Sequence, residues 1–147
     1  MSPWDSTNGK HLLEAQYKGF TLPPGKPELV IGQIHDDTDD VVRILIKGTK
    51  GKSLETAKLI ASFSKGKDQG SVDIPLGTVY HDKEFSVDIL TTKKGIKITF
   101  NGTKIVNYVK SGKRWYFKVG AYVLSNLKYD KKGAFGEIGF RAKITHS

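Results

Sequence analysis

The sequence has no cysteine, which excludes disulfide bonds, thiolate metal ligands and a cysteine nucleophile together. It also has no apolar run near the ~18 residues that a helix needs to cross a bilayer, so we expect no membrane partner. Helical periodicity is missing as well, because no segment repeats apolar residues at a spacing of about 3.6 over three turns. What remains is a chain of 147 residues, 37% hydrophobic and 27% charged, a composition typical of one globular domain.

Arginine is scarce, although the chain is strongly basic. Lysine and arginine total 24 against 15 acidic residues, which gives a formal net charge of +9 and predicts a polyanionic partner. The arginines are only Arg43, Arg114 and Arg141, whereas nucleic-acid-binding proteins favour arginine for its bidentate contacts with phosphate and guanine. A lysine-rich surface fits a carboxylated polymer at least as well, and lysines that serve solubility alone explain the same charge.

Alternating hydrophobic and polar residues predict an all-β fold. Residues 85–90 alternate in this way, and residues 41–46 form a short β-branched run typical of a buried strand. Turn signals separate such runs at short intervals, and Asn101-Gly102 is the strongest hairpin signal because both residues tolerate positive φ. We therefore expect a single domain over residues 1–147, built as a β-jelly-roll sandwich of about ten strands.

Two of the predicted strands carry polar side chains on one face. In residues 30–35, Gln33 and His35 are two positions apart and therefore point to the same side of a sheet. Residues 115–122 alternate in the same way, with one apolar face that we expect to join the core. The opposite face, which is polar, aromatic and cationic, carries Tyr116, Lys118, Gly120 and Tyr122. Either strand alone is an ordinary solvent-exposed surface, but together they offer amide and imidazole donors, a fixed positive charge and phenols able to transfer protons.

These two segments carry a resemblance to a known family. Gln33-Ile34-His35 and Tyr116-Phe117-Lys118-Val119-Gly120-Ala121-Tyr122 resemble the QIH and YFKxGxY signatures of the polysaccharide lyase family 7 alginate lyases. The resemblance extends over the whole chain, because Trp4 and His11 lie where that family has its tryptophan and following strand, and residues 85–102 are similar to its late hairpin. It implies a jelly roll whose concave sheet binds alginate, an acidic polysaccharide, and cleaves it by β-elimination without a cofactor or a metal ion.

The same resemblance implies roles for individual residues. Gln33, assisted by His35, would neutralise the carboxylate beside the carbon that loses its proton, where an enolate-like transition state develops negative charge. Tyr122 would be both the acid and the base, giving a proton to the departing C4 oxygen, with His35 as the alternative base on the other epimer. Lys118 would bind a neighbouring carboxylate, and Tyr116 would line the trough. A tyrosine that acts as a base near neutral pH needs a pKa below its usual value of about 10, and a nearby cation such as Lys118 would lower it.

One motif of the family is missing from this sequence. These lyases carry an arginine-rich strand of the form RxELR just upstream of the tryptophan segment, and its first arginine helps to neutralise the substrate carboxylate. None of the three arginines of this chain lies in such a motif. We expect the strand to come from a preceding segment of a longer protein or from a second chain, or else the activity to be weakened by roughly a hundredfold or more. A missing strand would also leave a sheet edge uncovered beside the active face.

Three alternatives stay open beside the lyase hypothesis. A non-catalytic module that binds acidic polysaccharide on the same fold is the main one, and the missing arginine strand favours it. A nucleic-acid-binding β domain explains the charge but not the grouping of glutamine, histidine and tyrosine, so we expect no nucleic-acid partner. Residues 36–40, with four aspartates, place carboxylates as calcium loops do, yet a polar turn explains them as well. Because alginate is an extracellular polymer, the resemblance also implies a secreted protein.

Overall fold

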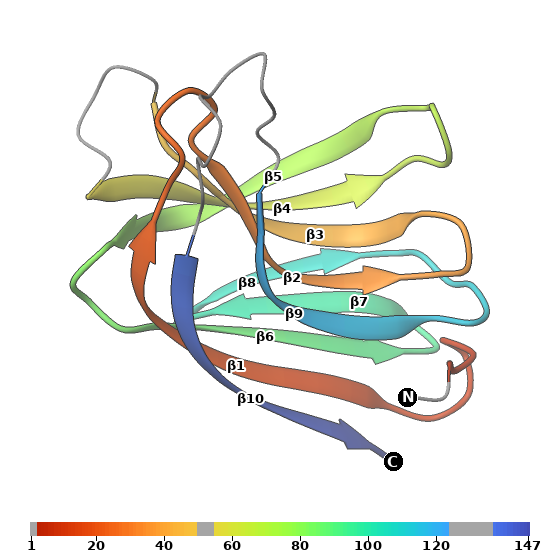
Figure 1. The fold of residues 1–147 in the computed structure, drawn as a ribbon. Coiled ribbons are helices and arrows are strands. Elements are labelled where there is room, and N and C mark those ends of the chain that lie inside the picture. Colours follow the sequence, from red (N-terminus) through yellow and green to blue (C-terminus); the bar gives the residue numbers. More distant parts are fainter. Residues whose placement is uncertain (1–2, 50–54, 124–136) are drawn as a thin grey trace.

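The computed structural model describes residues 3–49, 55–123 and 137–147, which form ten strands in two layers (Figure 1). The strands are β1 (His11–Thr21), β2 (Glu28–His35), β3 (Asp40–Lys47), β4 (Thr56–Ser64), β5 (Ser71–Tyr80), β6 (Phe85–Thr92), β7 (Gly95–Phe100), β8 (Lys104–Tyr108), β9 (Tyr116–Val123) and β10 (Glu137–His146). All described pairings are antiparallel, and they make one sheet of order β5-β4-β3-β2-β9 and a second of order β10-β1-β6-β7-β8. In the described part of the chain, no helix is long and apolar enough to cross a membrane.

The expected all-β sandwich is confirmed, and several strands follow the predicted patterns. The run 41–46 lies within β3, and the alternating segment 85–90 lies within β6, whose residues are alternately buried and half-buried. Asn101 and Gly102 connect β7 to β8 with φ values of 50° and 71°, so both adopt the left-handed conformation that the hairpin signal predicted.

The hydrophobic core lies between the two sheets and takes side chains from each of the ten described strands. The side chains that alternate with these core positions point outward. Its largest fully buried side chains include Tyr17 from β1, Ile44 from β3, Phe63 from β4 and Ile89 from β6. β2 is different from the other strands, because residues 29–34 are buried on both of its faces. A strand buried on both faces reads as a nearly continuous apolar run, and any polar side chain on it needs a specific environment.

An aromatic cluster joins the two ends of the described chain. The Trp4 ring stacks on His11 with 4.0 Å between the ring centroids, and backbone hydrogen bonds pair Trp4 with Trp115 in both directions at 2.9 Å. His11 Nε2 lies 2.8 Å from the carbonyl oxygen of Asn8, which can only accept, so this nitrogen carries the proton of the neutral ring. His11 Nδ1 therefore accepts the 2.7 Å hydrogen bond from His146 Nδ1, which joins β1 to β10.

This histidine pair predicts a loss of stability in mild acid. Burial, reinforced by the charge of His11, lowers the pKa of His146 below its usual value of about 6.5. As the pH falls below that value, the unfolded chain takes up a proton that the folded chain binds less readily, so the free energy of unfolding decreases. Between about pH 7.5 and pH 5.5, the melting temperature of the wild type should fall further than that of His146→Gln.

The matched control for this prediction is His81→Gln, since His81 lies in the exposed turn between β5 and β6. That variant should follow the wild-type dependence of melting temperature on pH. Equal slopes for the wild type and His146→Gln would show that the pair does not contribute to the acid sensitivity.

Candidate functional site

β2 places two of the expected site residues between β3 and β9. Gln33 lies opposite Lys118 of β9, and His35 lies opposite Tyr116 of β9. Directly opposite residues of antiparallel strands point to the same face, with Cβ atoms about 5 Å apart. Four of the five expected residues therefore meet on the outer face of the sheet β5-β4-β3-β2-β9, which we call the polar face.

Tyr122, the fifth expected residue, lies on β9 with its backbone opposite Val30 of β2. The pairing of the two strands shifts between the Gly32–Val119 pair and the Val30–Tyr122 pair, where β9 has one extra residue. The simple alternation predicted from Tyr116 through Tyr122 is thus interrupted by a bulge, a feature that re-aims side chains locally. The Tyr122 side chain lies outside the part that the structure describes.

The contacts of His35 determine which of its nitrogens can accept a proton. Nδ1 lies 2.5 Å from the backbone carbonyl oxygen of Asp36, and a carbonyl can only accept, so Nδ1 carries the proton of the neutral ring. The phenolic oxygen of Tyr116 lies 3.2 Å from the same nitrogen and accepts a second, weaker hydrogen bond from this N–H group. Nε2 is therefore the basic nitrogen, and it lies 3.7 Å from Oδ1 of Asp40. The phenolic hydrogen of Tyr116 stays available to another acceptor.

Gln33 and Lys118 supply an amide and a cation beside this imidazole. The Gln33 residue is only 6% exposed, so its amide acts in an environment with little water, where polar interactions are stronger than in solution. The Lys118 ammonium lies 5.8 Å from the centroid of the Tyr116 ring, within the range of a cation–π contact. The two β9 side chains therefore also contact each other on the polar face.

The registers of all five strands extend this group into a line of polar residues across the sheet. Each member lies directly opposite the next on the neighbouring strand. The line, which we call the polar row, consists of Lys118 on β9, Gln33 on β2, Arg43 on β3, Ser62 on β4 and Asp73 on β5. The position of Arg43 in this row was not predicted from the sequence, because Arg43 lies in no arginine motif. Its signal in the sequence is that a single cation interrupts the otherwise apolar run 41–46.

The far end of the polar row is anionic. Hydrogen bonds from the Ser62 hydroxyl at 2.6 Å and the Ser71 hydroxyl at 2.8 Å, together with the nearby charge of Arg43, hold the pKa of Asp73 below its usual range. Asp73 is therefore ionised at neutral pH. The row thus runs from a cation on β9 to an anion on β5.

Comparison with known proteins identifies relatives of this chain. Residues 2–146 match the sequence family described as alginate lyase. The chain belongs to the alginate lyase family. Comparison with curated proteins finds no match.

Three solved structures illustrate the similarity to other alginate lyases. AlgAT5, an alginate lyase of polysaccharide lyase family 7, is 31% identical with a TM-score of 0.80, and the match covers 99% of this chain and 63% of that one. An alginate lyase from Pseudomonas aeruginosa is 19% identical with a TM-score of 0.84, over 99% of this chain and 68% of that one. The family 7 alginate lyase A1-II′, in a tyrosine-to-phenylalanine variant with its product GGG, is 16% identical with a TM-score of 0.77, over 99% and 65%.

This alginate lyase family member therefore spans about two thirds of the length of these relatives. The resemblance that the two motifs carried is confirmed for the family and the fold. The likeness to the structures below 25% identity supports the fold alone.

The aspartate-rich segment of this family member forms a polar turn. The Asp36 carboxylate accepts hydrogen bonds from the backbone N–H groups of Thr38 and Asp39, both at 2.8 Å, and from the Thr38 hydroxyl at 3.2 Å. Burial acts to raise the pKa of Asp36, but these hydrogen bonds outweigh it and lower the pKa. Within the described ranges, no group of three histidine, aspartate or glutamate side chains is arranged to hold a metal ion.

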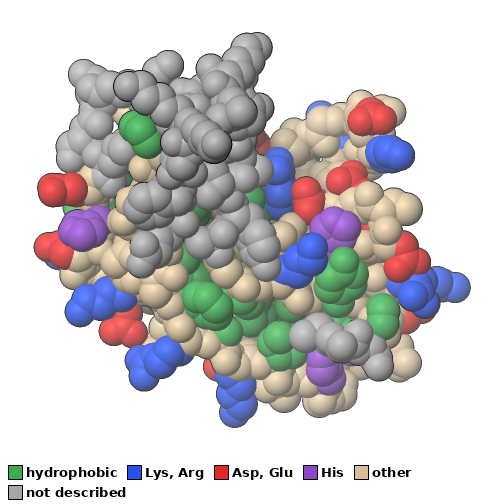
Figure 2. Space-filling model, viewed as in Figure 1, with side chains coloured by type: hydrophobic (Ala, Val, Ile, Leu, Met, Phe, Trp, Pro, Cys, Tyr) green, Lys and Arg blue, Asp and Glu red, His purple; other side chains and the backbone are tan. Residues whose placement is uncertain are grey.

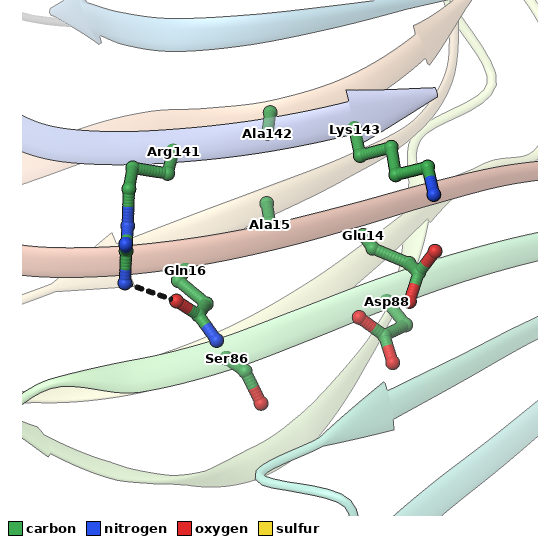
Figure 3. A pocket seen from close by; sticks show the side chains of 8 residues that line it. All are labelled: Glu14, Ala15, Gln16, Ser86, Asp88, Arg141, Ala142 and Lys143. Carbon is green, nitrogen blue, oxygen red and sulfur yellow. Dashed lines mark hydrogen bonds between the residues drawn. The ribbon is translucent and has the colours of Figure 1, made fainter. Parts of the chain in front are cut away.

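A hollow of about 420 Å³ lies on the opposite sheet of the alginate lyase fold, on the outer faces of β1, β6 and β10 (Figure 3). Two carboxylates and two cations line it: Glu14 lies opposite Lys143 in the ladder of β1 and β10, and Arg141 donates a 2.7 Å hydrogen bond to Gln16. Burial, with a smaller effect of Glu14, raises the pKa of Asp88. Acidic and basic residues are equal in number in this lining, and the hollow is separated from the polar face by the core.

A glycine beneath the polar face holds β2 close to the second sheet. The buried Tyr17 hydroxyl donates a 2.9 Å hydrogen bond to the Ile31 carbonyl oxygen, and a Cβ added at Gly32 would lie 3.0 Å from that hydroxyl. Burial raises the pKa of Tyr17 far above its usual value, so this tyrosine stays neutral and is unsuited to proton transfer. Gly32 immediately precedes Gln33, and its lack of a side chain therefore helps to set the depth of the site.

The contact between Gly32 and Tyr17 predicts a non-additive pair of substitutions. Gly32→Ala should lower the free energy of unfolding by about 1–3 kcal/mol, because the added methyl group presses on the Tyr17 hydroxyl. Tyr17→Phe removes the hydroxyl and one buried hydrogen bond, at a cost of about 1–3 kcal/mol. In the Tyr17→Phe background, Gly32→Ala should cost clearly less, as measured by urea unfolding. Strictly additive costs would show that the two groups do not meet.

Proposed function

We propose that this chain is an alginate lyase that cleaves its polymer by β-elimination on the polar face. The observation that supports this most directly is the register that sets Gln33 and His35 of β2 against Lys118 and Tyr116 of β9. An amide donor, a basic imidazole nitrogen, an ammonium and a phenol are the groups that elimination from a uronate requires.

The proposed reaction assigns each bond change to a group. A base removes the proton at C5 of the uronate, the electron pair of that C–H bond forms the C4=C5 double bond, and the bond from C4 to the glycosidic oxygen breaks. The departing oxygen takes a proton, in this proposal from Tyr122. The Gln33 amide donates to the carboxylate attached to C5, where negative charge develops, and Lys118 binds the carboxylate of a neighbouring unit.

The tautomer of His35 suits it to the role of the base. Its Nδ1 proton is held by the Asp36 carbonyl, so Nε2 is the atom that would receive the C5 proton. The Asp40 carboxylate, 3.7 Å from Nε2, would stabilise the imidazolium that results. Tyr116, which accepts from Nδ1, would direct its own phenolic hydrogen toward the sugar.

Ultraviolet absorbance during incubation with alginate, polymannuronate and polyguluronate tests this proposal, because elimination creates a double bond conjugated to a carboxylate and hydrolysis does not. We expect absorbance to rise with the wild type and the rate to fall by roughly a hundredfold or more in Tyr122→Phe. The control is Tyr80→Phe on β5, which removes the hydroxyl of an exposed tyrosine. No rise in absorbance with retained binding of alginate would favour the non-catalytic module.

The binding module is the second candidate, and the position of β9 favours it. In the described sheet, β9 pairs along its length with β2 alone, and its other edge is next to the proposed catalytic residues. The arginine strand that the family resemblance leads us to expect is not among the described strands. A module of this kind would keep the cation and amide of the polar row without the elimination chemistry.

We also propose that the outer edge of β9 receives the arginine-bearing strand, from a preceding segment of a longer protein or from a second chain. Trp115 exchanges both backbone hydrogen bonds with Trp4, so its N–H and C=O groups point to the side away from β2. Such groups alternate sides along a strand, and Phe117 therefore presents its own to the same outer edge. An antiparallel ladder that begins at the Trp4–Trp115 pair continues, on the amino-terminal side of Trp4, along β9 beside Phe117 and the site.

Hydrophobic side chains lie at the surface near this edge of β9. Figure 1 shows β9 and β10 at the front, and the same view in Figure 2 shows hydrophobic side chains between the two sheets. An uncovered strand edge next to apolar surface is a site for pairing with another strand.

Extending the chain tests this edge directly. A version that carries an RxELR strand before Trp4 should show a lyase rate at least about a hundredfold above that of the 147-residue chain. The matched control is the same extension with its first arginine replaced by alanine, which should pair with β9 but not raise the rate. Hydrogen exchange at the Phe117 amide should slow in both extended versions. Unchanged exchange at Phe117 would show that the extension does not pair with β9.

A further inference from the structure

Arg43 differs from the other two arginines of the sequence in where it points and how far it is buried. It lies in the polar row between Gln33 and Ser62, and its side chain is 29% exposed. Arg114 precedes β9, is 63% exposed and pairs with Asp37, while Arg141 lies on the opposite sheet and is 80% exposed. A half-buried cation on the polar face makes stronger contacts with an anion than either exposed arginine does.

The described ion pair of Arg43 is made at Nε and not at the two terminal nitrogens of the guanidinium. Among the described residues, its one ion pair is with Asp40, between Nε and Oδ2 at 3.6 Å. This contact is made at the Nε side of the group, so the two terminal nitrogens are not used in it. The terminal nitrogens of a guanidinium bind a carboxylate through two parallel hydrogen bonds.

Asp40 also connects Arg43 to the site already described. Its Oδ1 lies 3.7 Å from His35 Nε2, and its Oδ2 is the atom that contacts Arg43. The arginine and the proposed base are therefore positioned by the same carboxylate.

A hollow of about 220 Å³ opens beside Arg43, over the ends of β3, β4 and β5. Its lining includes Arg43, Asp39, Asp40, Ser62, Ser64 and Ser71. Apart from the guanidinium, these side chains offer hydroxyl and carboxylate oxygens, which accept hydrogen bonds from sugar hydroxyls. The volume is below the about 300–1,000 Å³ of common small-molecule sites, which suits one sugar unit rather than an oligosaccharide.

We propose that Arg43 binds the carboxylate of the uronate unit next to the one at Gln33, and that the hollow beside it receives the hydroxyls of that unit. This proposal rests on the proposed function and extends its substrate site by one unit. Neighbouring strands are about 4.8 Å apart, close to the length that one pyranose unit adds to an extended chain, so adjacent members of the polar row meet adjacent units. Ionised Asp73 lies beyond Arg43 and repels a further carboxylate, so this subsite is the last at that end.

The experiment compares Arg43→Gln with Arg141→Gln in binding and cleavage of alginate oligosaccharides. Arg43→Gln should weaken binding by about tenfold or more and raise KM by a similar factor, with kcat changed by less than about threefold. Arg141→Gln should behave as the wild type. Arg43→Lys, which keeps the charge but not the fork, should recover part of the affinity.

Oligosaccharides whose carboxyl groups are reduced to alcohols distinguish recognition of the carboxylate by Arg43 from a role of Arg43 in the folding of the protein. Arg43→Gln and the wild type should bind the reduced oligosaccharides equally, because the group that Arg43 recognises is gone. An equal loss of affinity for native and reduced oligosaccharides would assign Arg43 a structural role and overturn the proposal. Thermal melts of both variants show whether each one is folded.

The outcomes distinguish this inference from the proposed function. Binding of alginate that depends on Arg43, without any cleavage, supports the subsite and contradicts the lyase activity. Cleavage by the wild type that Arg43→Gln leaves unchanged overturns the subsite alone. A wild-type chain that neither binds nor cleaves alginate overturns both.

Discussion

The hydrogen-bonded register of β2 against its two neighbours controls which side chains meet on the polar face. Gln33 lies opposite Arg43 on one side and Lys118 on the other because residues 32–34 of β2 keep a regular register with both β3 and β9. A slip by one residue would turn the polar side chains into the core. Burial of the strand on both faces makes such a slip costly, and the close approach of Gly32 to the Tyr17 hydroxyl fixes the depth of the strand.

The charge of the chain is distributed in a way that the net value of +9 does not convey. In Figure 2, basic side chains are interspersed with acidic ones instead of forming one cationic surface. The polar row shows the same mixture, with Lys118 and Arg43 followed by an ionised Asp73. Such a surface recognises a polyanion through contacts with its individual carboxylates, and the net charge of the chain contributes less.

The sequence was sufficient to predict the fold class and the position of four of the five expected site residues on one face of a sheet. Alternation every two residues carries the information about faces, so Gln33, His35, Tyr116 and Lys118 were correctly placed together. The bulge near Tyr122 was not predictable, because one extra residue in a ladder leaves no mark in the hydrophobic pattern. Contacts between strands distant in sequence, such as those of Arg43 with the row, depend on pairing that a single sequence does not reveal.

The pairing of β1 with β10 has a consequence for how the chain reaches this structure. β1 is the first and β10 the last of the described strands, yet they are neighbours along their whole length, and Lys10 and Ser147 exchange backbone hydrogen bonds at 2.8 and 2.9 Å. During synthesis one edge of β1 stays unpaired until β10, the last of the described strands, has left the ribosome. Closing so long a loop slows folding, and the waiting edge is open to pairing with other nascent chains until β10 arrives.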